Sequence, residues 1–165
     1  MLAQLLKALP APLHRTLLRL AQRVRLGVWG LLRREVRGCN VLAFDGAGRV
    51  LLVRHSYHER DRWLLPGGGL TRGEDPAATG ARELAEETGC QLVQGCWIAT
   101  DVRPMPGGWT NRIELVAGLT SGQPRPDGRE IAEAAFFNLE ALPAATGTLV
   151  HASLARWREW RASER

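Results

Sequence analysis

The sequence has few cysteines, and their spacing gives no sign that they act together. It contains Cys39, Cys90 and Cys96, an odd number without any C-x-x-C spacing. A disulfide scaffold or a cysteine zinc site requires paired cysteines at characteristic spacings, so the sequence indicates neither. We therefore expect the protein to work in a reducing compartment, with the cytoplasm as the default prediction.

Long apolar runs are also missing. No stretch approaches the roughly 20 apolar residues that a membrane-spanning helix needs, and arginines interrupt every apolar run near the N-terminus, which argues against a secretory signal peptide. Internal repeats and low-complexity tracts are absent as well. With 165 residues, 45% hydrophobic and 24% charged, the chain has the composition of a globular protein with one hydrophobic core.

Excess basic charge is confined to the first segment of the chain. Residues 1–37 contain eight basic residues against the single acidic residue Glu35, a net charge of +7, which leaves −2 for residues 38–165 out of the total of +5. Because the larger part of the chain is mildly acidic, we expect no nucleic-acid binding by that part.

The basic segment has the pattern of an amphipathic helix. Its apolar residues recur at helical spacing, namely Leu13, Leu17, Leu20, Val24, Val28 and Leu31. Arg15, Arg19 and Arg23 form a stripe on another side. Three interpretations stay open for residues 13–36: a helix packed on its own domain or on the second subunit of a homodimer, a helix lying on a membrane surface, or a nucleic-acid contact or transit peptide.

Beyond residue 37 the apolar pattern changes to the period of two that β-strands have. The predicted strands are 38–44, 49–54, 91–102, 111–119 and 134–138, and residues 149–160 form a closing helix. The sequence Asp45-Gly46-Ala47-Gly48 between the first two strands is a hairpin signal. We therefore predict an α/β domain over residues 38–165, with a mixed sheet between helices, and a helical extension over residues 1–37.

The most informative segment lies between Gly68 and Cys90. Asp75 is a good N-cap residue, Pro76 fits the first helical position, and Gly89 fits a left-handed helix end. These ends predict a short helix, whose buried face is formed by Ala77, Ala81, Leu84 and Thr88.

Three carboxylates share one side of this helix. Glu83, Glu86 and Glu87 fall within an arc of roughly 100° beside the apolar stripe. A solvated acidic face is the plain interpretation, but like charges four residues apart and acids in the last helical turn are both unfavourable. A divalent cation would compensate for this crowding, and converging oxygen ligands suit Mg²⁺ or Mn²⁺. Arg82 is placed to hold one of the carboxylates in position.

Gly68 to Cys90 resembles a complete Nudix box, G-x5-E-x7-R-E-U-x-E-E-x-G-U, in which U is an apolar residue. Every specified position matches, and Cys90 in place of an aliphatic residue is a mild departure. The resemblance covers about residues 38–143 and implies the α/β/α sandwich of Nudix hydrolases. It also implies metal-dependent hydrolysis of the diphosphate linkage in a nucleoside diphosphate joined to another moiety.

The resemblance assigns roles to individual residues. It implies that the metal ligands are Glu83, Glu86 and Glu87, completed by a backbone carbonyl of Gly67 or Gly68. The general base is one of these three glutamates, such as Glu83, or a later glutamate, for which Glu130 and Glu133 are the candidates, although either is equally well explained as solvated charge. Glu74 is expected to brace the loop before the helix through hydrogen bonds.

The substrate is less well determined by the sequence than the metal site. The candidate contacts are Arg54, His55, Arg103, Trp109 and Arg112, because arginine grips phosphate and tryptophan stacks on a base. Each is also a common surface or loop residue. Pro104 and Pro106 straddle the position downstream of the box where ADP-ribose-cleaving members of the resembled family tend to carry proline. The resemblance therefore slightly favours a nucleotide sugar such as ADP-ribose, with a nucleoside triphosphate as the other expectation. A non-catalytic nucleotide-binding module and a membrane-surface protein acting through residues 13–36 are the alternatives.

Overall fold

The computed structural model describes residues 24, 28, 35–56, 61–106, 108–126, 128 and 130–164. Most of the predicted amphipathic helix over residues 13–36 therefore lies outside the described residues. Val24 and Val28, which belong to its apolar stripe, are helical and are 59% and 46% exposed. The interpretations of this segment therefore stay predictions.

The remaining elements follow the predicted order. They are β1 (Glu35–Phe44), β2 (Val50–His55), β3 (Gly67–Gly69), α3 (Pro76–Thr88), β4 (Gln91–Pro104), β5 (Thr110–Ser121), β6 (Ile131–Phe137) and α4 (Thr148–Ser163). The predicted strands and the two helices predicted within residues 38–165 are confirmed, with longer bounds at several ends. Strand β1 begins at Glu35 rather than at residue 38, because its first residues pair with β5.

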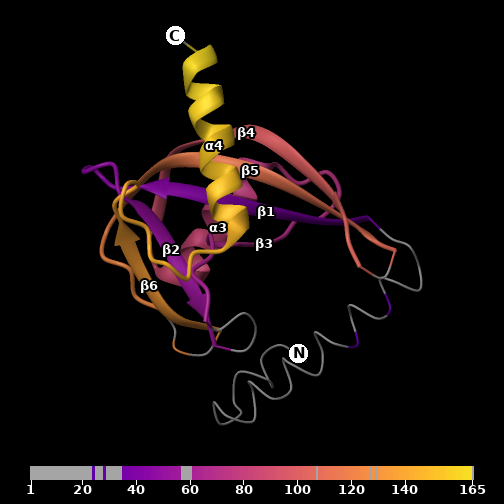
Figure 1. Cartoon of the computed structure of the whole chain (residues 1–165), viewed down its shortest axis with the longest axis horizontal. Coiled ribbons are helices and arrows are strands. Elements are labelled where there is room, and N and C mark those ends of the chain that lie inside the picture. The colour runs from indigo at the N-terminus through magenta and orange to yellow at the C-terminus, as the bar shows by residue number, and fades with distance from the viewer. Residues whose placement is uncertain are drawn as a thin grey trace.

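The strands form one mixed sheet in the order β4-β5-β1-β2-β6 (Figure 1). Strand β1 runs parallel to β5 along its whole length, from Glu35 opposite Thr110 to Phe44 opposite Leu119. On its other side β1 has two partners in succession. The first half pairs with β3, and the end of the strand pairs with β2 through the hairpin at residues 45–48. The short strand β3 is thereby held beside the beginning of β1.

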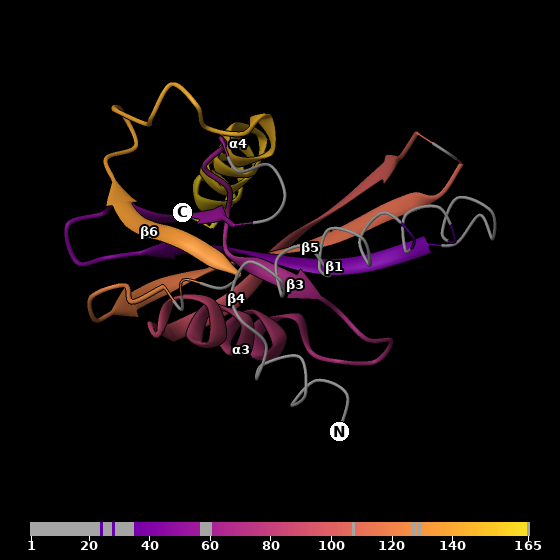
Figure 2. The same cartoon turned by 90° about the horizontal axis from the view of Figure 1, so that it is seen from below.

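One helix covers each face of this sheet, and Figure 2 shows the sheet edge-on between α4 and α3. Alternate residues of β1 point to opposite faces. Val41 packs with Leu84 of α3, whereas Leu42 packs with Leu154 of α4. Because both faces are covered, the central strands are nearly continuous apolar runs. The predicted arrangement of helices on both faces of a mixed sheet is confirmed for the described residues.

The cysteines contribute to packing rather than to a cross-link. All three are free thiols, with Cys39 and Cys90 fully buried beneath α3. Burial, together with the nearby charges of Glu83 and Glu114, raises the pKa of the Cys39 thiol to about 12. None of the described helices has the length and apolar character needed to cross a membrane.

Candidate active site

Helix α3 begins and ends where the sequence predicts. The Asp75 side chain accepts a hydrogen bond of 2.8 Å from the backbone N–H of Ala78, and Pro76 occupies the first helical position. At the other end Gly89 has a φ of 70°, and its N–H donates to the carbonyl of Ala85 over 2.9 Å. Both caps satisfy backbone groups that a helix end leaves unpaired, so the helix has a defined length and register.

The buried side of α3 lies unusually close to the sheet. Leu84 and Thr88 are buried as predicted, whereas Ala77 is only half-buried. The prediction missed Gly80, which lies one turn before Leu84 and is buried. A Cβ at position 80 would approach the Val41 side chain to 3.0 Å, so glycine sets how closely the helix can pack.

Glu83 points from this helix towards the glycine strand β3. Its carboxylate rests against Gly68, where any Cβ would overlap the carboxyl group. A guanidinium nitrogen of Arg82 lies 2.8 Å from Glu83 Oε1, and the Glu83 side chain is only 15% exposed. The glycine at position 68 therefore makes the space that the carboxylate occupies.

Glu86 and Glu87 complete the acidic side of α3. The same Arg82 nitrogen lies 3.5 Å from Glu86 Oε2, so Arg82 bridges two of the three predicted ligands. Glu87 instead accepts a hydrogen bond of 3.0 Å from the backbone N–H of Gly67. The structure thus brings all five predicted metal-site residues, together with Arg82, to the junction of α3 and β3.

The electrostatics of this junction reflect crowded negative charge. Burial is the largest cause that raises the pKa of the Glu83 carboxyl above its ordinary value. The Arg82 guanidinium opposes the rise, and the charges of Glu86 and Glu130 add to it. Glu130 therefore lies close enough to Glu83 for the two carboxylates to repel each other. The single positive charge of Arg82 does not balance the negative charges of Glu83, Glu86 and Glu130.

The donor set has the composition that Mg²⁺ or Mn²⁺ prefers, namely carboxylates together with nearby backbone carbonyls. Within the part of the chain that the structure describes, no three acidic, histidine or cysteine side chains already converge as a metal cage. Instead Glu83 and Glu86 share Arg82, and Glu87 bonds to Gly67. The oxygen ligands and the excess negative charge of Glu83, Glu86 and Glu87 suit a divalent cation. Their side chains would have to rotate to coordinate it.

The loop that enters α3 is braced by Glu74, as predicted. Glu74 Oε2 accepts a hydrogen bond of 2.9 Å from the backbone N–H of Thr71 and lies 3.5 Å from the hydroxyl of Thr79. These contacts tie residues 71–74 to the first turn of the helix. They help to fix the position of β3 relative to α3, which carries the carboxylates.

Glu133 and Arg54 meet at the end of β2 that adjoins this site. Arg54 Nη2 donates to Glu133 Oε1 over 2.7 Å, and the Arg54 guanidinium lies 5.4 Å from the centre of the Trp63 ring. His55 pairs with Ile131 across the same two strands. The backbone carbonyl of Glu130 accepts from the N–H of Ser56 over 2.9 Å. Four predicted site residues therefore lie together on the adjoining ends of β2 and β6.

Arg103 lies on the other face of the sheet, in a hollow beneath α4. The hollow has a volume of about 160 Å³. It is lined by Ala99, Asp101, Arg103, Ile113, Leu115, Leu149, Ala152, Ser153 and Arg156. We call it the arginine hollow. Asp101 Oδ2 lies 2.6 Å from both Nε and Nη2 of Arg103, which orients that side chain.

The NUDIX domain model matches residues 34–158 of this chain. The chain belongs to the NUDIX domain family. This confirms the family that the sequence between Gly68 and Cys90 predicts. The matched range contains every element from β2 to β6, and it reaches into α4.

Curated relatives of this NUDIX protein have several names. The NAD-capped RNA hydrolase NudC of Vibrio parahaemolyticus is 28% identical over 116 residues, which are 69% of this chain and 44% of the relative. An RNA pyrophosphohydrolase of Dinoroseobacter shibae is 36% identical over 83 residues, 45% of this chain and 52% of the relative. An ADP-ribose pyrophosphatase of Mycobacterium tuberculosis is 35% identical over 119 residues, 65% of this chain and 56% of the relative. The chain spans about half the length of these relatives.

Solved structures show the same fold. A MutT NUDIX hydrolase from Burkholderia pseudomallei superposes with a TM-score of 0.65 at 23% identity, over 74% of this chain and 97% of that one. The Escherichia coli ORF135 protein superposes with a TM-score of 0.64 at 18% identity, over 80% and 94%. At these identities the likeness establishes the fold of the NUDIX domain alone.

Two predicted substrate residues lie elsewhere in the NUDIX domain. Arg112 is on the α3 face of the sheet, where its Nε donates to Glu114 Oε1 over 3.0 Å. Trp109 is buried in the β4–β5 turn, and its carbonyl accepts from the N–H of Met105 over 2.8 Å. Neither residue lines the arginine hollow.

Glu114 is a buried carboxylate that the sequence prediction missed. It accepts hydrogen bonds of 2.9 Å from the indole N–H of Trp97 and 2.6 Å from the hydroxyl of Thr100, besides the bond from Arg112. Burial would raise the pKa of this carboxyl, but the hydrogen bonds from Thr100, Trp97 and Arg112 outweigh burial and hold it below its ordinary value. The sequence does contain a signal for this residue, because Glu114 is a single glutamate within the apolar run Ile113-Glu114-Leu115-Val116.

Proposed function

We propose that this NUDIX protein is a metal-dependent hydrolase that cleaves the diphosphate linkage of a nucleoside diphosphate joined to another moiety. The observation that carries the proposal is the set of carboxylates Glu83, Glu86 and Glu87, which α3 presents against the backbone of Gly67 and Gly68. This crowding opposes helix stability, since two of the acids lie in the last helical turn. A binding site for cations and phosphate explains it better than solubility does.

In the proposed mechanism the three glutamates hold Mg²⁺, with Mn²⁺ as the other suitable ion. When bound, the ion neutralises diphosphate charge and lowers the pKa of an attacking water. Arg82 orients Glu83 and Glu86 through its contacts of 2.8 and 3.5 Å. Glu130 is the better candidate for the general base, because its charge is felt at Glu83, whereas Glu133 is engaged by Arg54.

The arginine hollow is the proposed site for the nucleoside. Gly38 of β1 pairs with Gly69 on one side and with Ile113 on the other. Two strand spacings, roughly 10 Å, therefore separate the glycine strand from the floor of the hollow. A nucleoside diphosphate can span this distance. Arg103 and Arg156 at the hollow offer guanidinium groups to phosphate or to a base edge.

The moiety beyond the diphosphate is proposed to be a sugar, as in ADP-ribose, with a nucleoside triphosphate as the second choice. The relative named ADP-ribose pyrophosphatase supports the first choice by its similarity alone. Other relatives have names that refer to RNA, so the absence of a nucleic-acid substrate stays a prediction.

A substrate screen tests the proposed function. The purified chain is incubated with ADP-ribose, dinucleoside polyphosphates and nucleoside triphosphates, with Mg²⁺ or Mn²⁺ varied, and phosphate-containing products are separated by chromatography. We expect metal-dependent release of a nucleoside monophosphate or of pyrophosphate. The double substitution Glu86→Gln and Glu87→Gln is expected to lower turnover by about 10³ or more, because it removes electrostatic stabilisation of the transition state.

The matched control places the same double change on two exposed glutamates at the end of α4, Glu159→Gln in the helix with Glu164→Gln at its C-cap. It is expected to leave turnover unchanged. Equal turnover in both double variants would contradict the proposal. Calorimetry that detects nucleotide binding without any turnover would instead identify a non-catalytic binding module.

A further inference from the structure

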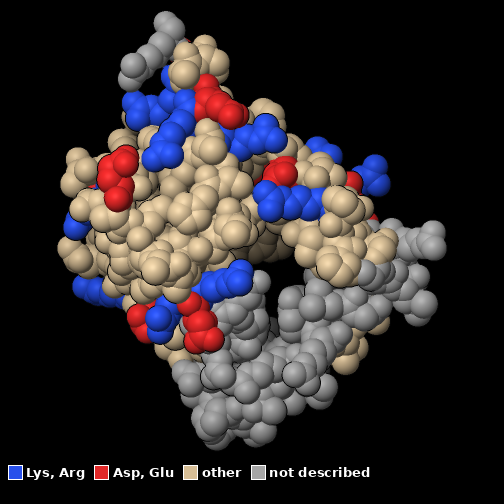
Figure 3. All heavy atoms as spheres, viewed as in Figure 1, with Lys and Arg blue, Asp and Glu red and all other residues tan. Residues whose placement is uncertain are grey.

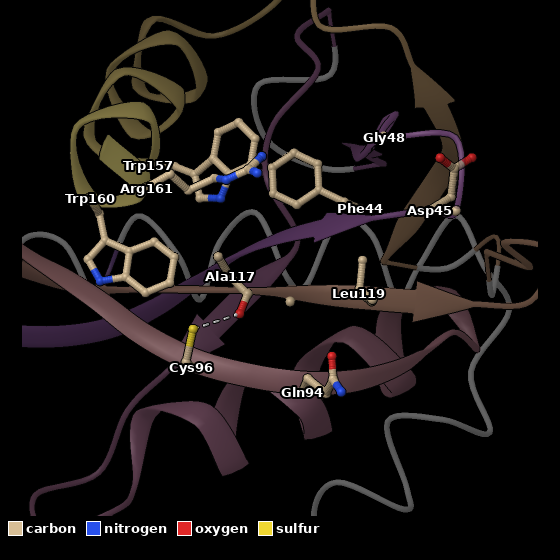
Figure 4. A pocket seen from close by; sticks show the side chains of 12 residues that line it. Phe44, Asp45, Gly48, Gln94, Cys96, Ala117, Leu119, Trp157, Trp160 and Arg161 are labelled. Carbon is tan, nitrogen blue, oxygen red and sulfur yellow. Dashed lines mark hydrogen bonds between the residues drawn. The ribbon is translucent and has the colours of Figure 1, made fainter. Parts of the chain in front are cut away.

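A second and larger hollow lies under the C-terminal half of α4 (Figure 4). Its volume is about 520 Å³. The helix contributes Trp157, Trp160 and Arg161 to it, and the sheet contributes the ends of β1 and β5 and the beginning of β4. We call it the tryptophan groove. Its volume is within the range of roughly 300–1,000 Å³ that small-molecule sites occupy.

The tryptophan groove is distant from the carboxylates. It lies at Phe44, the last residue of β1, whereas the glycine strand pairs with Gly38–Asn40 near the beginning of β1. At about 3.3 Å per residue, the intervening residues span roughly 13–20 Å along the strand. The groove is also distinct from the arginine hollow, with which it shares no lining residue. Its occupant would therefore not be the nucleotide bound at the carboxylates.

The walls of the groove suit a flat ring. Phe44 and Trp157 stack on each other with ring centroids 4.4 Å apart and planes inclined by 28°. Trp160 is half-buried beside them, and small residues, Ala117 and Gly118, form part of the opposite wall. Large aromatic faces opposite small side chains leave a slot in which a planar aromatic molecule can stack. Leu119, which is 51% exposed, lies at the rim.

The charge at the groove favours an anion. The Arg161 guanidinium lies 5.0 Å from the centre of the Trp157 ring, and no carboxylate of the described residues lies within ion-pair distance of it. Asp45, the acidic residue among the groove's lining, is already engaged by Arg49, with contacts of 2.7 and 2.8 Å. The charge of Glu164, just after α4, is also felt at the groove, where it adds to burial in raising the pKa of the Cys96 thiol. Arg161 is the cationic side chain of the lining. Figure 3 shows basic side chains around the upper part of the molecule, with acidic side chains among them. In the sequence α4 carries Arg156, Arg158 and Arg161 together with Glu159.

The backbone of β4 is strained where it meets the groove. Within the described ranges, Gln94 is the single residue other than glycine with a positive φ, at 53°. It lies in the irregular pairing between Val93 and Cys96, and Gly95 beside it would tolerate such a conformation more readily. A left-handed conformation is unfavourable for a residue with a Cβ. Strain of this kind is common where a side chain is directed towards a ligand, and the Gln94 amide lines the groove.

We propose that the tryptophan groove is a second ligand site, which binds a small planar aromatic anion. The ring stacks against Trp160 in the slot, the anionic group pairs with Arg161, and the Gln94 amide hydrogen-bonds to a polar edge of the ring. The inference is independent of the proposed hydrolase activity, because it rests on other residues of the molecule. A second copy of the chain and a neutral apolar molecule are the alternative occupants that the experiment separates.

The test uses two fluorescent probes of similar shape, 1-anilinonaphthalene-8-sulfonate and the uncharged N-phenyl-1-naphthylamine. Each is titrated into the full chain labelled with ¹⁵N at tryptophan. We expect the sulfonate probe to bind with one-to-one stoichiometry and to shift the indole N–H resonances of Trp157 and Trp160. The corresponding resonances of Trp63 and Trp97, which lie outside the groove, are expected to stay in place.

Matched substitutions test whether the charge of Arg161 and the space beside Leu119 are needed for binding. Arg161→Gln is expected to weaken sulfonate binding about tenfold, the size of a lost charge-assisted hydrogen bond, and to leave the neutral probe unaffected. Arg158→Gln, three residues earlier on α4 and outside the groove, is expected to change neither. Leu119→Trp is expected to obstruct the groove for both probes, whereas Val102→Trp, equally exposed at 51% on the α3 face, leaves binding unchanged.

Three results would overturn the proposal. One is an equal effect of Arg161→Gln and Arg158→Gln, and another is a sulfonate probe that shifts Trp63 or Trp97 instead of the groove tryptophans. The third is a dimer in sedimentation equilibrium that Leu119→Trp dissociates, since a second copy would then occupy the groove. Thermal unfolding of each variant shows whether its fold is retained, and Arg161→Gln keeps the test valid if Leu119→Trp fails to fold.

Discussion

The two faces of the sheet differ in what they offer to a ligand. On the α3 face, charged groups are held in fixed positions, as with Glu83 beside Arg82 and Glu114 among three donors. On the α4 face, an apolar core surrounds both the arginine hollow and the tryptophan groove. The α3 face therefore presents charged side chains in fixed orientations, whereas the α4 face presents two hollows.

The two helices reflect the same difference. Helix α3 has an aspartate N-cap, a glycine C-cap and a glycine at its closest approach to the sheet. Helix α4 has Gly147 at its N-cap position, which provides no side-chain hydrogen bond. The helix is held by aromatic contacts such as that of Phe44 with Trp157. Carboxylates that act on an ion need a defined register, which caps provide. Hollows need bulky side chains, which aromatic packing provides.

The largest expected effect is on the α3 face, at Glu114. Replacing it with glutamine removes the charge that three donors surround, and we expect the free energy of unfolding at pH 7 to fall by about 3 kcal/mol, the size of breaking a buried pair. Because the folded pKa of Glu114 is below its ordinary value, its stabilisation is complete above about pH 5 and is lost as the pH falls through the folded pKa. Urea unfolding from pH 7 to pH 3 measures this.

The control for Glu114 is Glu140→Gln, whose side chain is 93% exposed and lies 3.8 Å from Arg158. It is expected to unfold like the unmodified chain at every pH. A stability difference at Glu114 that stayed constant down to pH 3 would show that packing, rather than charge, holds this cluster together.

A smaller effect is expected on the α4 face, at the arginine hollow. If the nucleoside binds there, Arg156→Gln raises KM about tenfold, the size of one charge-assisted hydrogen bond, with kcat unchanged. Steady-state kinetics with the substrate found by the screen measures both constants. Arg158→Gln on the same helix is the control. A fall in kcat at constant KM would instead connect Arg156 with the chemistry at the carboxylates.

The smallest expected effect concerns the cap of α3. Asp75→Ala leaves the N–H of Ala78 without its side-chain acceptor and is expected to lower the free energy of unfolding by about 1 kcal/mol. Asp75→Asn retains an acceptor oxygen and is expected to lose much less. Urea unfolding distinguishes them, and equal losses in the two variants would show that the charge at residue 75 matters more than the cap.

The sequence predicts local features of this molecule well and long-range features less well. The ends of α3 follow from Asp75, Pro76 and Gly89, because a cap depends on residues a few positions apart. The acidic side of the helix follows from its period in the same way. The brace at Glu74 is local too, since its partners Thr71 and Thr79 are close in the sequence.

The rest depends on which distant segments meet. Glu114 has its role only because Trp97 and Thr100 lie opposite it on β4, in a register with two irregularities that the sequence does not reveal. Arg156 reaches the arginine hollow only because of how α4 packs over β4 and β5. Gly80 looked neutral in the helical pattern, although its missing side chain determines how closely α3 approaches β1.

Gly68 limits how this molecule can change over evolution. The Glu83 carboxylate occupies the space that a methyl group on residue 68 would fill, so even alanine there would displace it. The absence of a side chain at residue 68 thus determines how closely the Glu83 carboxylate on α3 can approach the backbone of β3. A substitution near the carboxylates preserves this arrangement only where it leaves that small volume to Glu83, whereas residues beneath α4 can change without affecting it.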